Sequence, residues 1–274
     1  MPTIPSGRTP QSAQEPHQER QLAESFGADA ARYDRTRPHY PDALVRAVVA
    51  ASPGPDVLDV GCGTGIAARQ FQAAGCTVLG VDVDARMAAY ARRGGVAVEV
   101  AAFEAWDPGG RAFDAVVAGQ TWHWIDPVAG AATAARVLRP GGCLALFWNV
   151  FQPPPALAET FSAVHRRVLP DAPRNPWTPA ARDGYAPVFT QVTDGIRRTE
   201  AFDAPRRQHF DWERSYTRDE WLDQLPTGAD AAQIPSARLA ELLTETGAVI
   251  DALGGSFTMP YRAVLITAAR TDTP

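Results

Sequence analysis

Short, almost uniformly apolar stretches alternate with amphipathic ones between residues 56 and 149. The apolar stretches predict strands, which are expected at residues 57–60, 77–81, 96–100, 113–118 and 143–148. The amphipathic stretches predict helices, which are expected at residues 66–74, 85–93 and 127–138. Strands with so few polar positions are typical of a parallel sheet that is covered by helices on both faces. An α/β fold of this kind binds its ligand at the carboxyl ends of the strands.

The segments on either side of this alternation have other patterns. Before it, helical spacing predicts one helix around Phe26 to Tyr33 and a second at 42–51. After it, we expect a helix at 156–168, a proline-rich loop to about 187, a strand around 210–216, a capping box at 217–220 that opens a short helix, a helix at 236–253 and a strand at 261–268. The predicted division is a flexible leader at 1–18, a helical lid at 19–55, a ligand-binding core at 56–150, a cap insert at 151–235 and a segment that completes the core at 236–274.

Composition excludes several classes of partner. The formal charge is −5, which argues against a nucleic acid or an anionic membrane as the main partner. All 26 basic residues are arginines, a bias typical of a GC-rich bacterial genome. The three cysteines are not clustered, so neither a disulfide framework nor a zinc site is indicated. Without a signal peptide or a long apolar run, we expect a cytoplasmic protein of undetermined oligomeric state.

The stretch VLDVGCGTG at residues 57–65 places three glycines directly behind a strand. A tight strand-to-helix turn alone would explain them. A ligand site explains them as well, because a backbone without Cβ atoms and the N-terminus of the next helix approach a ligand closely. Asp82 ends the following strand, where a carboxylate can bind the two hydroxyls of a ribose. The pattern therefore favours a nucleoside-containing ligand.

The acid inside this stretch narrows the kind of nucleoside ligand. Asp59 lies two residues before the first glycine, where it would repel the pyrophosphate of a dinucleotide. S-adenosylmethionine carries a sulfonium and an ammonium group, and both favour a neighbouring carboxylate. Because the sequence GTGIAA also fits the dinucleotide pattern GxGxxA, a nicotinamide cofactor stays an alternative.

Four segments carry a family resemblance: VLDVGCGTG, GVDVD, FDAVVAGQTWHW and RVLRPGGCLALFWN. In this order and spacing they resemble the class I S-adenosylmethionine-dependent methyltransferases, and in particular the UbiE-like and trans-aconitate-methyltransferase-like branch. ARYDRTRPHYP and GGSFTMPYRAVLITAAR are similar to outer parts of the same branch. The resemblance implies a Rossmann-like, seven-stranded, mostly parallel sheet with an antiparallel last strand.

The same resemblance implies roles for individual residues. Asp59, Gly61 and Gly63 would surround the methionine moiety, and Gly65 would support the turn. Asp82 would hold the ribose. The residues implied around the adenine and beneath the sulfonium are Val83, Ala102, Phe103, Glu104, Gly119 and Gln120. Glu104 is equally well explained as an acid at a helix N-terminus.

The acceptor side is predicted from aromatic and basic residues. Trp122, His123 and Trp124 follow the fourth strand, and His123 is either a bonded structural residue or the general base for a hydroxyl or amine nucleophile. Lid or substrate residues are expected at Tyr33, Arg37, Tyr40 and Trp148. Arg37 would pair with the methionine carboxylate or with an acidic substrate, or it is an ordinary surface arginine.

The leading hypothesis is methyl transfer from S-adenosylmethionine to the O, N or C atom of a small molecule, with S-adenosylhomocysteine as product, in bacterial specialised metabolism. The alternatives are a non-catalytic binding or sensor protein and an NAD-dependent oxidoreductase. No cluster of Asp, Asn and His suggests a magnesium site, so we expect no metal. Neither a nucleic acid nor a membrane is expected as partner.

Overall fold

The computed structural model describes residues 26–172, 175–178, 185–228 and 231–271. The leader expected at residues 1–18 lies outside these ranges, as does the start of the lid segment. The first described elements are a 3-10 turn, η2 (Phe26–Asp29), and the short helix α2 (Ala30–Thr36). Helix α3 follows at Asp42–Ala51, as the sequence predicts.

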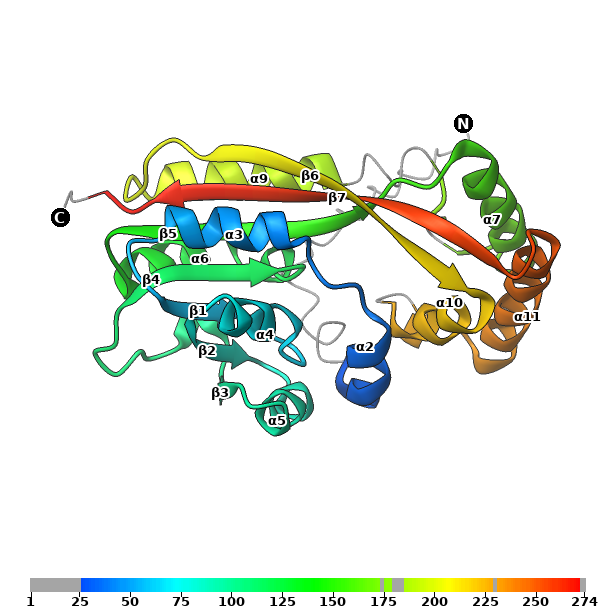
Figure 1. Ribbon diagram of the computed structural model, residues 1–274, viewed down its shortest axis with the longest axis horizontal. Coiled ribbons are helices and arrows are strands. Elements are labelled where there is room, and N and C mark those ends of the chain that lie inside the picture. Colours follow the sequence, from blue (N-terminus) through cyan, green and yellow to red (C-terminus); the bar gives the residue numbers. More distant parts are fainter. Residues whose placement is uncertain (1–25, 173–174, 179–184, 229–230, 272–274) are drawn as a thin grey trace, which may run out of the picture.

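The described chain is built around a twisted seven-stranded sheet (Figure 1). Its strands are β1 (Asp56–Val60), β2 (Thr77–Asp82), β3 (Ala97–Val100), β4 (Phe113–Gly119), β5 (Leu138–Phe151), β6 (Arg206–Thr217) and β7 (Ser256–Ala269). Their order is β3-β2-β1-β4-β5-β7-β6. Neighbours from β3 to β5 pair in parallel, whereas β7 is antiparallel to both β5 and β6. The predicted fold class, including the antiparallel last strand, is confirmed.

Helices cover both faces of this sheet. The remaining helices are α4 (Ile66–Ala73), α5 (Ala85–Arg93), α6 (Pro127–Val137), α7 (Pro155–Val168), α9 (Tyr185–Arg198), α10 (Arg218–Gln224) and α11 (Ser236–Ala252), with 3-10 turns η3 (Phe103–Ala105), η4 (Trp122–Trp124), η5 (Leu225–Thr227) and η6 (Ala231–Gln233). Helices α3, α4 and α5 bury apolar residues on one face together with Val57 of β1. Helices α6 and α9 do so on the other face with Leu58. Adjacent residues of one strand thus enter opposite cores, as the pleat requires.

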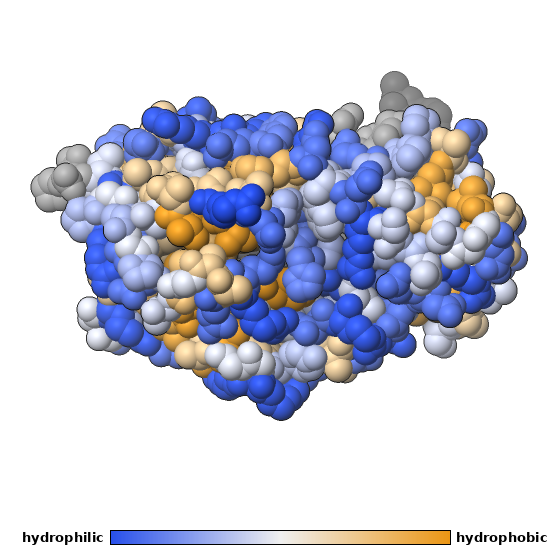
Figure 2. All heavy atoms as spheres, viewed as in Figure 1, coloured by the Kyte–Doolittle hydropathy of each residue, from blue (hydrophilic) through white to orange (hydrophobic). Residues whose placement is uncertain are grey.

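The far ends of β6 and β7 extend beyond the parallel strands and carry a third core with α7, α10 and α11 (Figure 1). This core is rich in aromatic rings, with Trp221 at its centre in contact with Phe161, Tyr216 and Phe257. Figure 2 shows apolar residues gathered over α3 and beside α7 and α11, with polar residues between them. The capping box predicted at 217–220 is present, because Thr217 and Glu220 bond each other's backbone N–H.

Two features of the range 151–235 differ from expectation. Helix α9 begins at Tyr185, inside the loop predicted to run to about 187, because Pro187 occupies its first turn, where proline needs no hydrogen bond. Strand β6 lies in the range expected as cap, yet it pairs with β7 along its whole length at the edge of the sheet. The other domain boundaries stay predictions.

Candidate functional site

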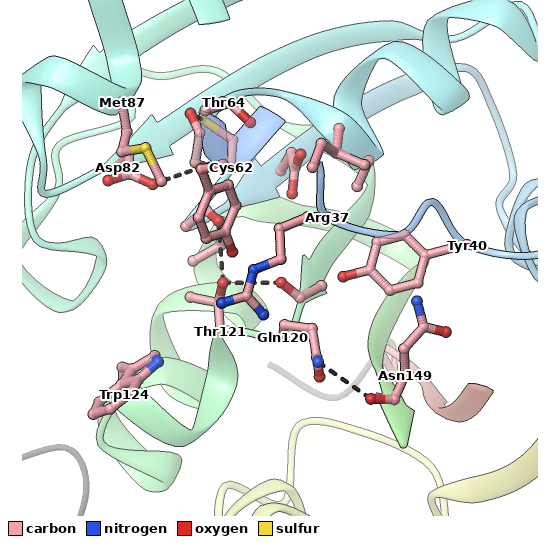
Figure 3. A pocket seen from close by; sticks show the side chains of 18 of the residues that line it. Arg37, Tyr40, Cys62, Thr64, Asp82, Met87, Gln120, Thr121, Trp124 and Asn149 are labelled. Atoms are coloured by element: carbon pink, nitrogen blue, oxygen red, sulfur yellow. Dashed lines mark hydrogen bonds between the residues drawn. The ribbon is translucent and has the colours of Figure 1, made fainter. Parts of the chain in front are cut away.

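A cavity of about 240 Å³ opens at the carboxyl ends of β1, β2 and β4 (Figure 3). Its walls come from the glycine turn after β1, from the ends of β2, β4 and β5, from the segment after α2, and from α9, α10 and β7. The topology explains the position, because the sheet order reverses between β1 and β4. The cavity therefore lies where the sequence predicts a ligand site.

The three glycines after β1 have positive φ angles of 62°, 55° and 88°. A Cβ atom on Gly61 would lie 2.0 Å from Cγ2 of Thr121, so this position excludes any side chain. A Cβ on Gly63 would meet only the Met87 side chain, at 3.9 Å. Gly61 and Gly63 line the cavity, whereas Gly65 lies behind them at the start of α4. At Gly61 the turn packs closely against Thr121, and at Gly63 its backbone is open to the cavity.

Asp59 is the most deeply buried acid at this turn, with 1% of its surface exposed. Its Oδ2 atom has no hydrogen-bond partner among the described residues. Burial, together with the negative charge of Asp82, raises the pKa of Asp59 to about 8. An unpartnered buried carboxylate that lines a cavity is costly on its own, and a cation bound beside it would offset that cost.

Asp82 lies at the end of β2 with 8% of its surface exposed. Its Oδ2 accepts a hydrogen bond from the backbone N–H of Gly63 at 2.7 Å, and its Oδ1 accepts one from that of Asp84 at 2.8 Å. Burial raises the pKa of Asp82, and these two bonds oppose the shift. Val83 follows with 39% of its surface exposed at the cavity wall. The carboxylate is therefore held rigidly next to an exposed apolar surface.

The residues expected around an adenine lie on η3 and beside it. Phe103 and Glu104 line the cavity, but Ala102 does not, and its neighbour Ala101 takes that place. The Phe103 ring packs against Trp106 and Trp122, with centroids 6.4 and 6.0 Å away. Glu104 accepts a hydrogen bond of 3.3 Å from the backbone of Asp126, the N-cap of α6, which supports its alternative reading as a helix N-terminal acid.

Gly119 and Gln120 form the floor at the end of β4. A Cβ on Gly119 would lie 2.5 Å from the Tyr40 hydroxyl. Gln120 has a φ of +57°, an uncommon conformation for a residue other than glycine. Its backbone N–H bonds the carbonyl of Phe147 at 2.9 Å, and its side-chain amide donates to the carbonyl of Asn149 at 3.3 Å. The Oε1 atom of Gln120 is left without a described partner.

The three aromatic residues of η4 have different surroundings in the structure. Trp124 lines the cavity, while Trp122 is fully buried in the core, and so is Trp148 on β5. His123 is half-buried and does not line the cavity. Its Nδ1 accepts a hydrogen bond of 3.2 Å from the indole of Trp148, which places the proton of the neutral ring on Nε2. This arrangement favours the structural interpretation of His123 over the general base.

Tyr33, Arg37 and Tyr40 all line the cavity from the lid segment. The side chain of Arg37 points into it (Figure 3), where the guanidinium also lies 4.8 Å from the centroid of the Tyr33 ring. One guanidinium nitrogen bonds the carbonyl of Thr227 on η5, and Nε has no described partner. Asn149, Tyr185, Gln224 and Tyr261 line the same part of the cavity.

Gln224 and Tyr261 were not singled out from the sequence. A signal for Gln224 exists, because it follows Trp221 by three residues on α10 and so puts a polar side chain on the apolar face of that helix. Tyr261 gives no such signal in an apolar strand. Thr121 is a third missed residue, and its hydroxyl bonds the carbonyls of Gly61 and Gly119 at 3.1 Å each.

Comparison with known proteins identifies the part of the chain that carries this turn. Residues 57–142 match the family model of a methyltransferase domain. This segment is therefore similar to a methyltransferase domain. Its fold also agrees with a structure described as a putative type II methyltransferase from Anaeromyxobacter dehalogenans, which is 24% identical, with a TM-score of 0.59 over 84% of this chain and 97% of that one. The predicted class I methyltransferase resemblance is confirmed.

Several methyltransferases are similar to part of the chain. An uncharacterised methyltransferase of Mycobacterium tuberculosis is 35% identical over 47% of this chain and 54% of its own length. A malonyl-[acyl-carrier protein] O-methyltransferase of Enterobacter lignolyticus is 33% identical over 51% of this chain and 61% of its own length. The chain thus spans about half the length of the first of these relatives.

Two further observations concern only the described residues. No helix among them is long and apolar enough to cross a membrane. In the same ranges, no three His, Cys, Asp or Glu side chains are grouped so that they could hold a metal ion. Metal independence of the methyltransferase domain stays a prediction.

Proposed function

We propose that this protein transfers a methyl group from S-adenosylmethionine to a small-molecule acceptor. The observation that carries the proposal is Asp59, which lines the cavity beside the glycine turn and has a buried carboxylate with one unpartnered oxygen. A sulfonium or an ammonium group beside this oxygen would stabilise the ionised form of the carboxyl group. The pyrophosphate of a nicotinamide cofactor would be repelled at the same place.

The ribose and the adenine of the cofactor would contact residues that follow the glycine turn along the cavity. Asp82 retains free lone pairs for the ribose hydroxyls, since each carboxylate oxygen accepts only one backbone bond. Exposed Val83 offers an apolar face for the adenine. Phe103 would close the opposite side of the ring.

The bound cofactor would supply a methyl group that is already activated by the positive sulfur. The protein then has to hold the acceptor in line with that methyl, and such positioning can lower a barrier by several kcal/mol. Gly119 allows the Tyr40 hydroxyl to pack against the floor, because a Cβ there would lie 2.5 Å from it. The lid segment and α10 would exclude water from above.

The acceptor atom is proposed to be oxygen. Three matched relatives carry the name O-methyltransferase, one of them a nocamycin O-methyltransferase of Saccharothrix syringae that is 42% identical over 39% of this chain and 41% of its own length. Nitrogen or carbon stays open to test. A role in the specialised metabolism of a bacterium, in its cytoplasm, belongs to the same proposal.

The test is isothermal titration of the full chain with S-adenosylhomocysteine and S-adenosylmethionine. We expect binding of both in the micromolar range and weaker binding by Asp59→Asn. Absence of binding to either nucleoside would overturn the proposal, and a fluorescence titration with NADH would then examine the oxidoreductase alternative. Bound cofactor without turnover on a broad acceptor panel would support a binding or sensor protein instead.

A further inference from the structure

Three of the side chains that line the cavity carry a buried polar atom without a hydrogen-bond partner among the described residues. These atoms are Nε of Arg37, Oε1 of Gln120 and Oε1 of Gln224. One of them is a donor and two are acceptors. A buried polar atom without a partner costs about 1 to 3 kcal/mol, so three at one place point to a ligand that satisfies them.

Arg37 lies on the acceptor side of the cavity. Its charge lowers the pKa of Tyr40 and of Tyr185, whereas burial, the larger effect, raises both. One guanidinium nitrogen bonds the carbonyl of Thr227, which holds the guanidinium against the cap. Arg37 is therefore placed to bind an anion at the cap end of the cavity.

Gln224 lines the cavity, and its Oε1 has no described partner. The residue is 6% exposed. Its side chain lies beside Tyr261, because burial raises the pKa of Tyr261 and a side-chain hydrogen bond with Gln224 opposes the shift. Tyr261 in turn is hydrogen bonded to Tyr216. The free Oε1 can only accept a hydrogen bond.

Aromatic rings surround these polar atoms. Phe151, Tyr185 and Tyr261 line the cavity at its cap end, and the Phe151 and Tyr261 rings lie 5.1 Å apart. Such walls suit a planar or apolar body between two polar ends.

We propose that the cap end binds an acceptor that carries an anionic group, held by Arg37, and a hydroxyl or amino group, which donates a hydrogen bond to Oε1 of Gln224. The anion is a carboxylate or a phosphate. The inference rests on the proposed methyl transfer, since it assigns the acceptor class to the same cavity. Arg37 and Gln224 then decide which acceptors are bound.

The test uses the full chain loaded with S-adenosylhomocysteine and measures ligand binding by isothermal titration. The carboxylate arm compares para-hydroxybenzoate and anthranilate with their uncharged amides, and the phosphate arm compares phosphoethanolamine with ethanolamine. We expect the anionic member of at least one arm to bind about tenfold or more tightly than its neutral counterpart, and Arg37→Gln to abolish this preference. Arg238→Gln, an exposed arginine paired with Glu241, removes the same charge as a control.

A second comparison tests the contribution of Gln224 to ligand binding. Gln224→Met is expected to weaken para-hydroxybenzoate about three- to tenfold and to leave benzoate, which lacks the hydroxyl, within about twofold. Gln233→Met, at an exposed position of η6, is the matched control.

Several outcomes overturn the inference while the proposed function stands. These are normal S-adenosylhomocysteine binding with no anionic probe bound in either arm, equal binding of charged and neutral probes, or an anion preference that survives Arg37→Gln. Weaker S-adenosylhomocysteine binding by Arg37→Gln would assign Arg37 to the methionine carboxylate instead. Failure of the wild-type protein to bind S-adenosylhomocysteine would count against the proposed function itself.

Discussion

The indole of Trp148 donates a hydrogen bond of 3.2 Å to Nδ1 of His123. Trp148 is fully buried, so its N–H has this one described acceptor and no access to water. We expect His123→Phe to lower the free energy of unfolding by about 1 to 3 kcal/mol, and His123→Gln, which keeps an acceptor, to cost less. Urea unfolding measures both. A general base would show the opposite result, with unchanged stability and lost turnover in both variants.

His123 should also make the stability of the folded protein depend on pH. Burial lowers the pKa of His123 from 6.5 to about 4, so the folded state prefers the neutral ring. The unfolded chain binds a proton first as the pH falls, and stability therefore declines between these two values. His123→Phe should show a shallower decline in this range, as measured by thermal unfolding in a series of buffers. An identical decline in wild type and variant would contradict this cause.

Binding of the cofactor should release a proton from Asp59. In the free protein the pKa of Asp59 is raised to about 8, chiefly by burial, so the carboxyl is largely protonated at neutral pH. A bound cation favours the carboxylate, and affinity for S-adenosylmethionine should rise as the pH increases toward 8. Titration in buffers of different ionisation enthalpy measures the released proton. Asp59→Asn should bind more weakly at every pH and release no proton from this position.

Gly61→Ala should disrupt the turn more than other glycine substitutions. A Cβ there would lie 2.0 Å from the Thr121 side chain, in addition to the strain of a positive φ. We expect a loss of about 2 to 5 kcal/mol in the free energy of unfolding, together with loss of cofactor binding. Gly141→Ala has a similar φ and open space, so its cost should be about 1 to 2 kcal/mol. Thr121→Ser in the Gly61→Ala background should restore part of the loss.

Asp223 on α10 holds the lid helix α2 against the cap. Its carboxylate pairs with Arg32 at 2.9 Å and with Arg35 at 2.6 Å. The hydrogen bond from Arg35 lowers the pKa of Asp223, so this contribution is present above the unfolded value of 3.8 and is lost as the pH falls below it. We expect Asp223→Ala to speed hydrogen exchange of the α2 amides about fivefold and to cost about 1 kcal/mol or less globally. Asp219→Ala, which removes a highly exposed acid of the same helix, should leave α2 exchange unchanged.

The parallel part of the fold could be predicted because its strands are uniformly apolar. Val57 and Leu58 enter two different cores. This follows from the pleat of the strand alone, because adjacent side chains point to opposite faces of a sheet. The first turn of α9 was not predicted because the prolines around it indicate a loop. The helical spacing of Phe189, Val192 and Ile196 is the signal that favours the helix. The role of β6 as the edge strand depends on pairing with β7. Residues 218–255 separate the two strands, so the pairing leaves no local signal in the sequence.

The part of the cavity at the glycine turn was more predictable than the part beside α10 and β7. Asp59 and Asp82 stand at fixed places in a strand-turn-helix pattern, so sequence position alone indicates where they lie. Gln224 and Tyr261 reach the cavity from a capped helix and an antiparallel strand that only the complete fold brings together. Trp148 looked like a substrate residue, but strand register turns it into the core.

Gln120 has a consequence for protein engineering. A side chain at a φ of +57° costs folding energy that glycine would not, while its oxygen is one of the unpartnered atoms of the cavity. A selection for thermal tolerance alone would therefore favour glycine at this position, and the selected protein would lose a contact to whatever it binds. At this residue, thermal stability favours glycine, whereas ligand recognition favours glutamine.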